Sequence, residues 1–417
     1  MPPEARHAST ARPVIDRIAR RAMRPALPAL LPTLLLVSLL LMLLSAFSAQ
    51  AAPRIGIATM QPGEIFFERF GHNAVVVDDP AQGEPISYNY GFFDPDEPGF
   101  VGRFVHGVMM YRLVALPWRQ DLQYYLDSGR GVTVQWLALD DAQATGVAAA
   151  LAENARPENA RYRYEYFTDN CATRVRDVVD RALGGGLKPQ LTVRSQGNTY
   201  RSEAVRLASP APWMWLGFDI GLGPSADQPM SRWEEAYVPM RLAESLREAR
   251  RPDGRPLVLR EEQVAPHRIA PEPPEFERRW WHWLVAGLAI AGLWLWLRAT
   301  LPRTAGGIAL LFWLGSGLLG ALMLFLWVDT DHRFTWANHN LLLLDPLALL
   351  LLPGAWAWLR GRSPGPLFRG VLIPILALAV AAVFLHWAAP QPQANAHWIA
   401  LLLPLHAAFA WSGLRRR

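Results

Sequence analysis

Cys171 is the only cysteine in the 417 residues, and it lies in the polar run Asp169-Asn170-Cys171-Ala172-Thr173-Arg174. A lone thiol cannot form a disulfide within its own chain, so either packing or reactivity must explain it. Polar neighbours and the start of a helix both lower a thiol pKa. A stabilisation of about 2 kcal/mol raises the thiolate fraction at neutral pH more than tenfold. We therefore predict that Cys171 is a nucleophile, the alternative being a small buried side chain.

A nucleophilic thiol needs a base, and the best candidate is His72, which follows Glu68-Arg69-Phe70-Gly71. His72 opens an apolar strand, so its ring can project from a sheet edge toward the helix of Cys171, and Gly71 permits a close approach. The alternative is a hydrogen-bonded structural histidine. His106 competes for the role, but it falls within a helix that we predict over residues 100–111.

Supporting groups are needed for two further roles. The first is to orient the imidazole, and the sequence does not decide which of Asn89, Asn73 and Glu68 does so. In an acyl reaction, the developing oxyanion would be held by the backbone amide of Cys171 and by the side chain of Asn170 or Arg174.

The elements that must position these residues are those of an α+β domain. Apolar residues alternate with the period of half-buried strands in three segments, residues 74–77, 86–90 and 132–136. An alanine-rich segment, residues 141–154, predicts a helix. Val175, Val178 and Val179 share one helical face with Cys171, and three glycines from Gly184 end that helix. This spacing places Cys171 in the first helical turn.

The N-terminus predicts export. A basic region with Arg17, Arg20, Arg21 and Arg24 precedes an apolar core over residues 34–44, and Ala49-Gln50-Ala51 has the small residues of a cleavage site. An uncleaved anchor is the alternative, although the core is short for a membrane span. We divide the chain into a signal peptide (1–51), a soluble domain (52–265), a proline-rich linker (266–279) and a membrane domain (280–417).

The membrane domain is predicted from apolar stretches of about 20 residues, the length that spans a bilayer. There are five, at residues 281–297, 308–328, 341–359, 371–388 and 398–414. Arginines follow the first, third and fifth stretches, which places those loops in the cytoplasm and the soluble domain outside. The same distribution explains the net charge of +5 without a nucleic-acid partner.

The outward loop between the second and third stretches carries further polar residues, among them His332, Asn338 and Asn340. They could line a lipid headgroup site, dock the soluble domain or form a solvated connector. Acidic and histidine residues in this loop lack the compact spacing of metal ligands, so we predict no metal and no cofactor.

Three segments resemble the Lnb family: residues 66–77 with Glu-Arg-Phe-Gly-His-Asn-Ala, residues 88–92 with Tyr-Asn-Tyr-Gly-Phe, and the run from Asp169 through Cys171 to Asp177. The resemblance covers most of the mature chain, and the Asp-Asn-Cys-x-Thr-Arg run is its most specific part. It implies a papain-related, circularly permuted cysteine fold like that of lecithin:retinol acyltransferase, with the pair Cys171 and His72. It also implies N-acylation of bacterial lipoproteins.

We therefore expect a multi-pass protein of the bacterial inner membrane with its catalytic domain in the periplasm. It would move an acyl chain from phospholipid through a Cys171 thioester to the amine of a diacylglyceryl lipoprotein. One alternative is a thiol peptidase or amidase that acts on cell-wall peptides with water as acceptor. The other is an envelope assembly factor without enzymatic activity.

Overall fold

The computed structural model describes residues 32, 34–38, 51–275, 277 and 279–415 and divides the chain into two units, residues 1–51 and 52–417. The arginine-rich start and the Ala49-Gln50 part of the predicted cleavage site lie outside the described residues. Within the predicted apolar core, residues 34–38 are helical. The fold described below is that of the second unit.

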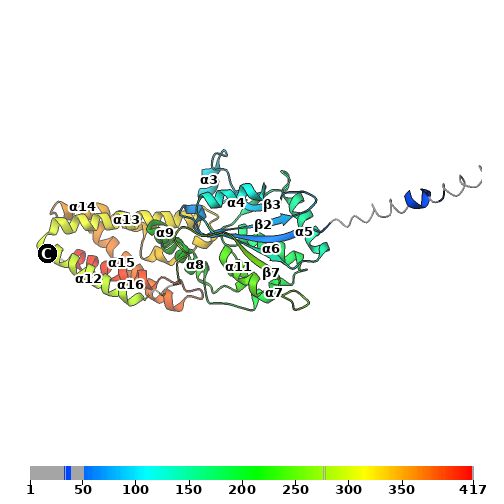
Figure 1. The fold of residues 1–417 in the computed structure, drawn as a ribbon. Coiled ribbons are helices and arrows are strands. Elements are labelled where there is room, and N and C mark those ends of the chain that lie inside the picture. Colours follow the sequence, from blue (N-terminus) through cyan, green and yellow to red (C-terminus); the bar gives the residue numbers. More distant parts are fainter. Residues whose placement is uncertain (1–31, 33, 39–50, 276, 278, 416–417) are drawn as a thin grey trace, which may run out of the picture. The chain divides into compact units, whose positions relative to one another are not determined.

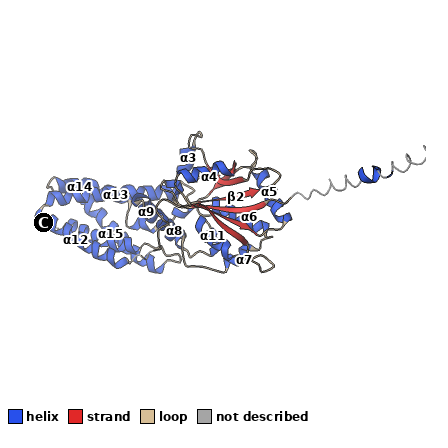
Figure 2. Ribbon diagram, in the orientation of Figure 1, coloured by secondary structure: helices blue, strands red, loops and turns tan. Residues whose placement is uncertain are grey.

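Seven antiparallel strands form one sheet in the order β6-β4-β3-β2-β1-β5-β7 (Figures 1 and 2). In chain order the strands are β1 (Arg54–Met60), β2 (His72–Asp78), β3 (Ile86–Phe92), β4 (Met109–Pro117), β5 (Val132–Leu137), β6 (Arg161–Tyr164) and β7 (Val258–Ala265). The three predicted strand segments lie within β2, β3 and β5. The last strand of the sheet ends at Ala265, just before the proline-rich segment.

Both faces of the central strands are buried. Val75 and Val77 of β2 join one apolar cluster, and Ala74 and Val76 join another on the opposite face. Helices α5 (Asp141–Asn154), α6 (Cys171–Ala182) and α11 (Pro239–Glu248) contribute to the first cluster, and α4 (Trp118–Asp127) contributes to the second. The expectation of half-buried strands is therefore wrong for the centre of the sheet, because helices cover both sides.

Helix α6 begins at Cys171 because Asn170 and Thr173 form a capping box. The Asn170 side-chain oxygen accepts the Thr173 N–H at 3.0 Å, and the Thr173 hydroxyl oxygen accepts the Asn170 N–H at 2.8 Å. The cap leaves the first-turn N–H groups of Cys171 and Ala172 without partners in the helix ladder. Cys171 is thus in the first turn, as predicted.

The predicted helix over residues 100–111 is wrong in its second half. Helix α3 (Phe100–Val105) is short, and β4 already begins at Met109. Gly107 has a φ of +73°, which ends the helical path, and the alternating Met109, Tyr111 and Leu113 are buried on one face of the sheet. The remaining elements before the membrane domain are η1 (Phe66–Glu68), α7 (Leu187–Thr192), α8 (Tyr200–Ala208), α9 (Pro212–Gly221), η2 (Pro224–Asp227) and α10 (Arg232–Glu235).

Four helices in the described part of the chain are long and apolar enough to cross a membrane. They are α12 (Trp280–Thr300), α13 (Pro302–Val328), α15 (Pro366–Ala388) and α16 (Ala396–Leu414). With the α+β domain that precedes them, they confirm the predicted two-part architecture.

The third predicted span is not a regular helix. It is a bent segment in which η3 (Arg333–Thr335) and η4 (His339–Leu342) are followed by η5 (Pro346–Leu351) and α14 (Leu352–Leu359), with a 42° bend at the break. Pro346 lacks an N–H, and the Asp345 carboxylate accepts the Leu347 N–H at 2.8 Å, which starts a new helical segment there. This segment packs tightly on α13, because a Cβ added at Gly306 would lie 2.4 Å from the Leu359 nitrogen.

Candidate active site

The Cys171 thiol and the His72 imidazole lie close enough for each to shift the pKa of the other. Cys171 is the first residue of α6 and His72 is the first residue of β2, and α6 packs directly on β2. The backbone N–H groups of Asn73 and Ala172 also reach the Cys171 sulfur. The structure therefore brings the two residues predicted to form the nucleophile and base into one site.

Burial raises the pKa of the Cys171 thiol, but the charge and hydrogen bond of His72, aided by the two backbone amides, outweigh it, so the pKa is lowered below its ordinary value. Burial lowers the pKa of His72, but the negative charge and hydrogen bond of Cys171 outweigh it, with smaller contributions from Asp121 and Asn89, so that pKa is raised. Both shifts favour a thiolate–imidazolium ion pair.

Asn89 is the orienting candidate that contacts the imidazole. Its side-chain oxygen lies 3.0 Å from Nε2 of His72, and its amide nitrogen donates to the Asp121 carboxylate at 3.0 Å and to the Ser87 hydroxyl at 3.1 Å. Because the nitrogen is committed to Asp121, the oxygen faces His72 and accepts its Nε2–H. The imidazole therefore presents Nδ1 to Cys171.

The other two orienting candidates have different partners. The Glu68 carboxylate accepts the Tyr124 hydroxyl at 2.6 Å and pairs with Arg130 at 3.3 Å. The Asn73 side-chain amide donates to the Thr59 hydroxyl at 2.9 Å. Asn73 acts on Cys171 through its backbone N–H, which helps to lower the pKa of the thiol.

The two oxyanion candidates use their side chains structurally. Asn170 caps α6 and donates to the carbonyls of Tyr166 and Tyr237 at 3.0 and 2.9 Å. Arg174 binds the Asp169 carboxylate at 2.5 and 2.7 Å and stacks on the Tyr162 ring, 3.9 Å from its centroid. Both side chains therefore already have partners within the domain.

Two glycines with positive φ allow the close approach of these elements. A Cβ added at Gly71 (φ +77°) would lie 2.8 Å from the Met60 carbonyl oxygen, beside His72. A Cβ at Gly91 (φ +93°) would lie 3.4 Å from the Tyr164 ring and 3.8 Å from the Cys171 Cβ. The sequence pointed to Gly71 for this role but did not reveal that Gly91 lies beside Cys171.

The polar residues of the outward loop dock the soluble domain. His332 Nε2 lies 3.1 Å from the Phe104 carbonyl oxygen at the end of α3. Asn338 donates to the Ile220 and Gly221 carbonyls at 2.8 and 2.9 Å, and Asn340 donates to Ile220 at 3.0 Å. Of the three roles that the sequence left open for this loop, these contacts support docking of the soluble domain.

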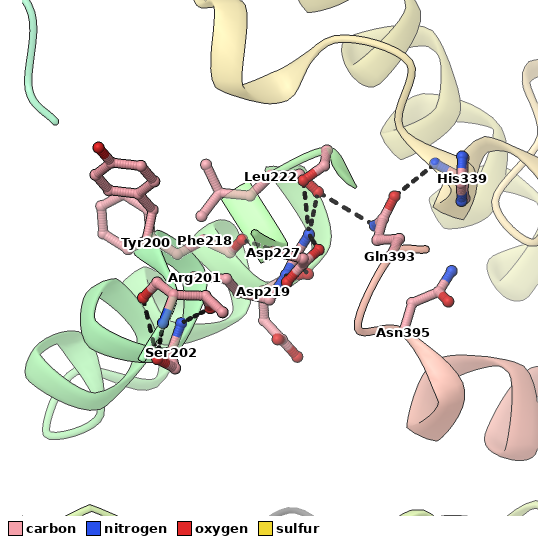
Figure 3. A network of polar contacts seen from close by, with 12 residues as sticks. Tyr200, Arg201, Ser202, Phe218, Asp219, Leu222, Asp227, His339, Gln393 and Asn395 are labelled. Carbon is pink, nitrogen blue, oxygen red and sulfur yellow. Dashed lines mark hydrogen bonds and ion pairs between the residues drawn. The ribbon is translucent and has the colours of Figure 1, made fainter. Parts of the chain in front are cut away.

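A buried polar network extends this docking from α8 and α9 into the membrane domain (Figure 3). Arg201 binds Asp227 through two 2.8 Å bonds and donates to the Leu222 carbonyl at 2.7 Å. Gln393 donates to the same carbonyl at 3.2 Å, and its side-chain oxygen accepts the His339 N–H at 2.7 Å. Side chains of the membrane domain thus bind the backbone carbonyls at the end of α9.

The candidate site lies beside this docking region. Tyr166 and Phe167, just before Cys171, have ring contacts with His332 at 6.0 Å and with Phe334 at 4.9 Å, respectively. Phe70, just before His72, meets Phe218 of α9 at 5.6 Å. Among the described residues there is no group of three or more potential metal-binding side chains.

Comparison with known families agrees with this two-part organisation. The model described as the Lnb N-terminal periplasmic domain matches residues 49–203, and the model described as the Lnb transmembrane domain matches residues 279–415. Searches of curated proteins and of solved structures gave no significant match.

The chain belongs to the Lnb family. It is a multi-pass membrane protein with a periplasmic domain. Family membership indicates a membrane protein of lipoprotein processing.

Proposed function

We propose that this protein is a cysteine acyltransferase that moves an acyl chain from a phospholipid to the N-terminal amine of a diacylglyceryl lipoprotein. The observation that carries the proposal is the arrangement Cys171–His72–Asn89, in a domain docked on membrane helices. A thiolate held beside an oriented imidazolium is suited to attack an ester carbonyl.

In the first half-reaction, the Cys171 thiolate attacks the ester carbonyl and forms a carbon–sulfur bond. First-turn amides of α6 donate to the oxyanion. The bond between the carbonyl carbon and the glycerol oxygen breaks, and the His72 imidazolium gives its Nδ1 proton to the leaving alkoxide. The products are a lysolipid and an acyl thioester on Cys171.

In the second half-reaction, the free amine of the lipoprotein attacks the thioester carbonyl. His72, now neutral, accepts the amine proton at Nδ1, and the carbon–sulfur bond breaks to give an amide. The leaving thiolate is again paired with an imidazolium, so the starting charge state returns. Asn89 keeps Nε2 protonated throughout and so directs both transfers to Nδ1.

The test uses the full chain in lipid nanodiscs with a diacylglyceryl-cysteine peptide that has a free amine. One arm carries labelled acyl chains on the phospholipid, and the other carries them on the peptide's own esters. We expect labelled amide in the phospholipid arm, none with Cys171→Ala, and none when the peptide amine is blocked. Label from the peptide arm alone would keep the acyltransferase but overturn phospholipid as donor. Release of free fatty acid or of cell-wall peptides, without amide, would favour the hydrolase.

A further inference from the structure

Six exposed apolar side chains form a rim on the periplasmic domain near the candidate site. The apolar rim comprises Ile65, Phe66 and Phe67 around η1, Phe104 and Val105 of α3, and Trp213 of α9. Phe67 is 55 % exposed and Trp213 is 65 % exposed, which is costly for aromatic side chains that face only water. Contiguous apolar groups of this kind mark a surface that is covered in use.

Ring contacts make the rim continuous across three elements. Phe66 stacks on Trp213 at 5.9 Å, which joins η1 to α9. On the other side, Phe67 meets Phe93 edge-on at 5.5 Å, and Phe93 stacks on Phe100 at 5.6 Å. Phe100 in turn stacks on Phe104 at 6.2 Å within α3.

Both ends of the rim are fixed at the outer ends of membrane helices. At the α3 end, the His106 ring lies 5.9 Å from the Phe325 ring in the last turn of α13, and the His106 carbonyl accepts the Asp331 N–H at 2.8 Å. At the α9 end, the Asp219 carboxylate bonds to His397 and Trp398 in the first turn of α16, at 2.8 and 2.9 Å. The rim is therefore held at the level where the hydrocarbon-spanning helices begin.

A branch of the same aromatic system leads inward to the thiol. Phe93 stacks on Tyr111 at 5.1 Å, and Tyr111 meets Tyr164 at 4.5 Å. Tyr164 and the Cys171 Cβ both lie against Gly91, at 3.4 and 3.8 Å from a Cβ placed there. The aromatic side chains thus extend from the exposed rim to Gly91, which lies beside the nucleophile.

We propose that the apolar rim is immersed in the outer leaflet and is the place where lipid acyl chains leave the bilayer for Cys171. Its occupant is lipid, because the rim continues the surface of α13, where Trp327 and Val328 are themselves exposed. The role in acyl delivery rests on the proposed function, whereas immersion does not.

Immersion is tested with a fluorescent label in a Cys171→Ala background, in which introduced cysteines are the sole thiols. Phe66→Cys and Trp213→Cys are compared with Val193→Cys, at a position 84 % exposed on the soluble domain. In phosphatidylethanolamine–phosphatidylglycerol vesicles, labels at 66 and 213 should be quenched by lipid-bound nitroxide and protected from iodide. The label at 193 should show the reverse. Iodide quenching at 66 and 213 equal to that at 193 would overturn the proposal, as would burial of these labels in a second protein copy.

Delivery is tested by acyl capture on Cys171. Phe66→Ser combined with Trp213→Ser is compared with Val193→Ser combined with Leu259→Ser, at two exposed positions on other elements. We expect the rim variant to capture acyl chains from vesicles about tenfold more slowly or worse, since each lost aromatic removes apolar burial in the leaflet. Capture from monomeric dihexanoyl phosphatidylcholine should match the control. Equal losses with both donors would overturn the delivery role, and a wild-type chain that captures nothing would overturn the proposed function while the quenching result stands.

Discussion

The side-chain oxygen of Asn89 lies 3.0 Å from Nε2 of His72, and the amide nitrogen of the same Asn89 side chain is held 3.0 Å from Asp121. This relationship fixes the tautomer of the imidazole, because an amide oxygen can only accept a hydrogen bond. The ring nitrogen that faces Cys171 is then Nδ1, and in the proposed reaction the proton is transferred through that atom.

Asn89→Ala should therefore impair turnover without removing the nucleophile. We expect a loss of about tenfold or more in acyl-transfer rate, since the imidazole loses the group that sets its tautomer and angle. Asn159→Ala, which removes an exposed asparagine whose side chain bonds only to Glu153 among the described residues, is the matched control. Thioester formation followed by mass spectrometry gives the rate, and unchanged turnover in Asn89→Ala would exclude Asn89 from the mechanism.

The paired pKa shifts predict how the reactivity of Cys171 depends on pH. Because the thiol pKa is lowered, alkylation by iodoacetamide should persist as the pH falls below the ordinary thiol range, and it should be lost only when the pH falls through the lowered value. Because the His72 pKa is raised, His72 stays protonated to a higher pH than an ordinary histidine and loses its proton only above that pH. His72→Ala should move the alkylation profile upward. A wild-type profile like that of a free thiol would contradict the ion pair.

Gly91 supplies a test of the space beside the thiol. Gly91→Ala places a methyl group 3.8 Å from the Cys171 Cβ and 3.4 Å from the Tyr164 ring, at a positive φ. Gly83→Ala carries similar backbone strain at φ +81° but meets nothing within 4 Å. Both variants should lose roughly 1 kcal/mol of stability from strain, yet only Gly91→Ala should slow alkylation and acyl capture. Equal activity in the two would show that Gly91 has no role at the site.

Asp219 supplies a test of the docking between the periplasmic and membrane domains. Asp219→Ala removes the acceptor of His397 and Trp398 in a buried setting, and we expect a loss of about 1–3 kcal/mol in unfolding free energy. Limited proteolysis of the linker over residues 266–279 should become faster in detergent. Asp253→Ala, at an exposed turn, should behave like the wild type in both assays. A stable, protease-resistant Asp219→Ala protein would show that docking depends on other contacts.

Local signals in the sequence were enough to predict α5, the start of α6 at Cys171 and the strands that carry His72 and Asn89. Each depends on a short-range pattern, such as a capping residue or the alternation of apolar side chains. The choice of Asn89 over Asn73 and Glu68 could not be made, because it depends on strand register and on Asp121, which comes from α4 on a distant part of the chain. The third span was predicted but its bend was not, because hydropathy records composition, whereas Pro346 and the Asp345 cap determine the backbone path.

The helix end at Gly107 was missed for a similar reason. The apolar residues after it fit both a helix and a strand. They form the strand β4 because it pairs with β3 and β6. Capping by Asn170 was also hidden, since a polar residue beside a nucleophile suits an oxyanion donor as well as a helix cap.

The central claim is that Cys171 carries the acyl group, and intact-protein mass spectrometry of the full chain in nanodiscs tests it most directly. With phospholipid present and no amine acceptor, we expect a mass increase of one acyl chain that maps to the peptide containing Cys171. Hydroxylamine should remove it, a lipopeptide with a free amine should discharge it, and Cys171→Ala should never acquire it. An acyl adduct that persists in Cys171→Ala, or amide formation with no adduct on Cys171 at any time, would contradict a Cys171 thioester intermediate.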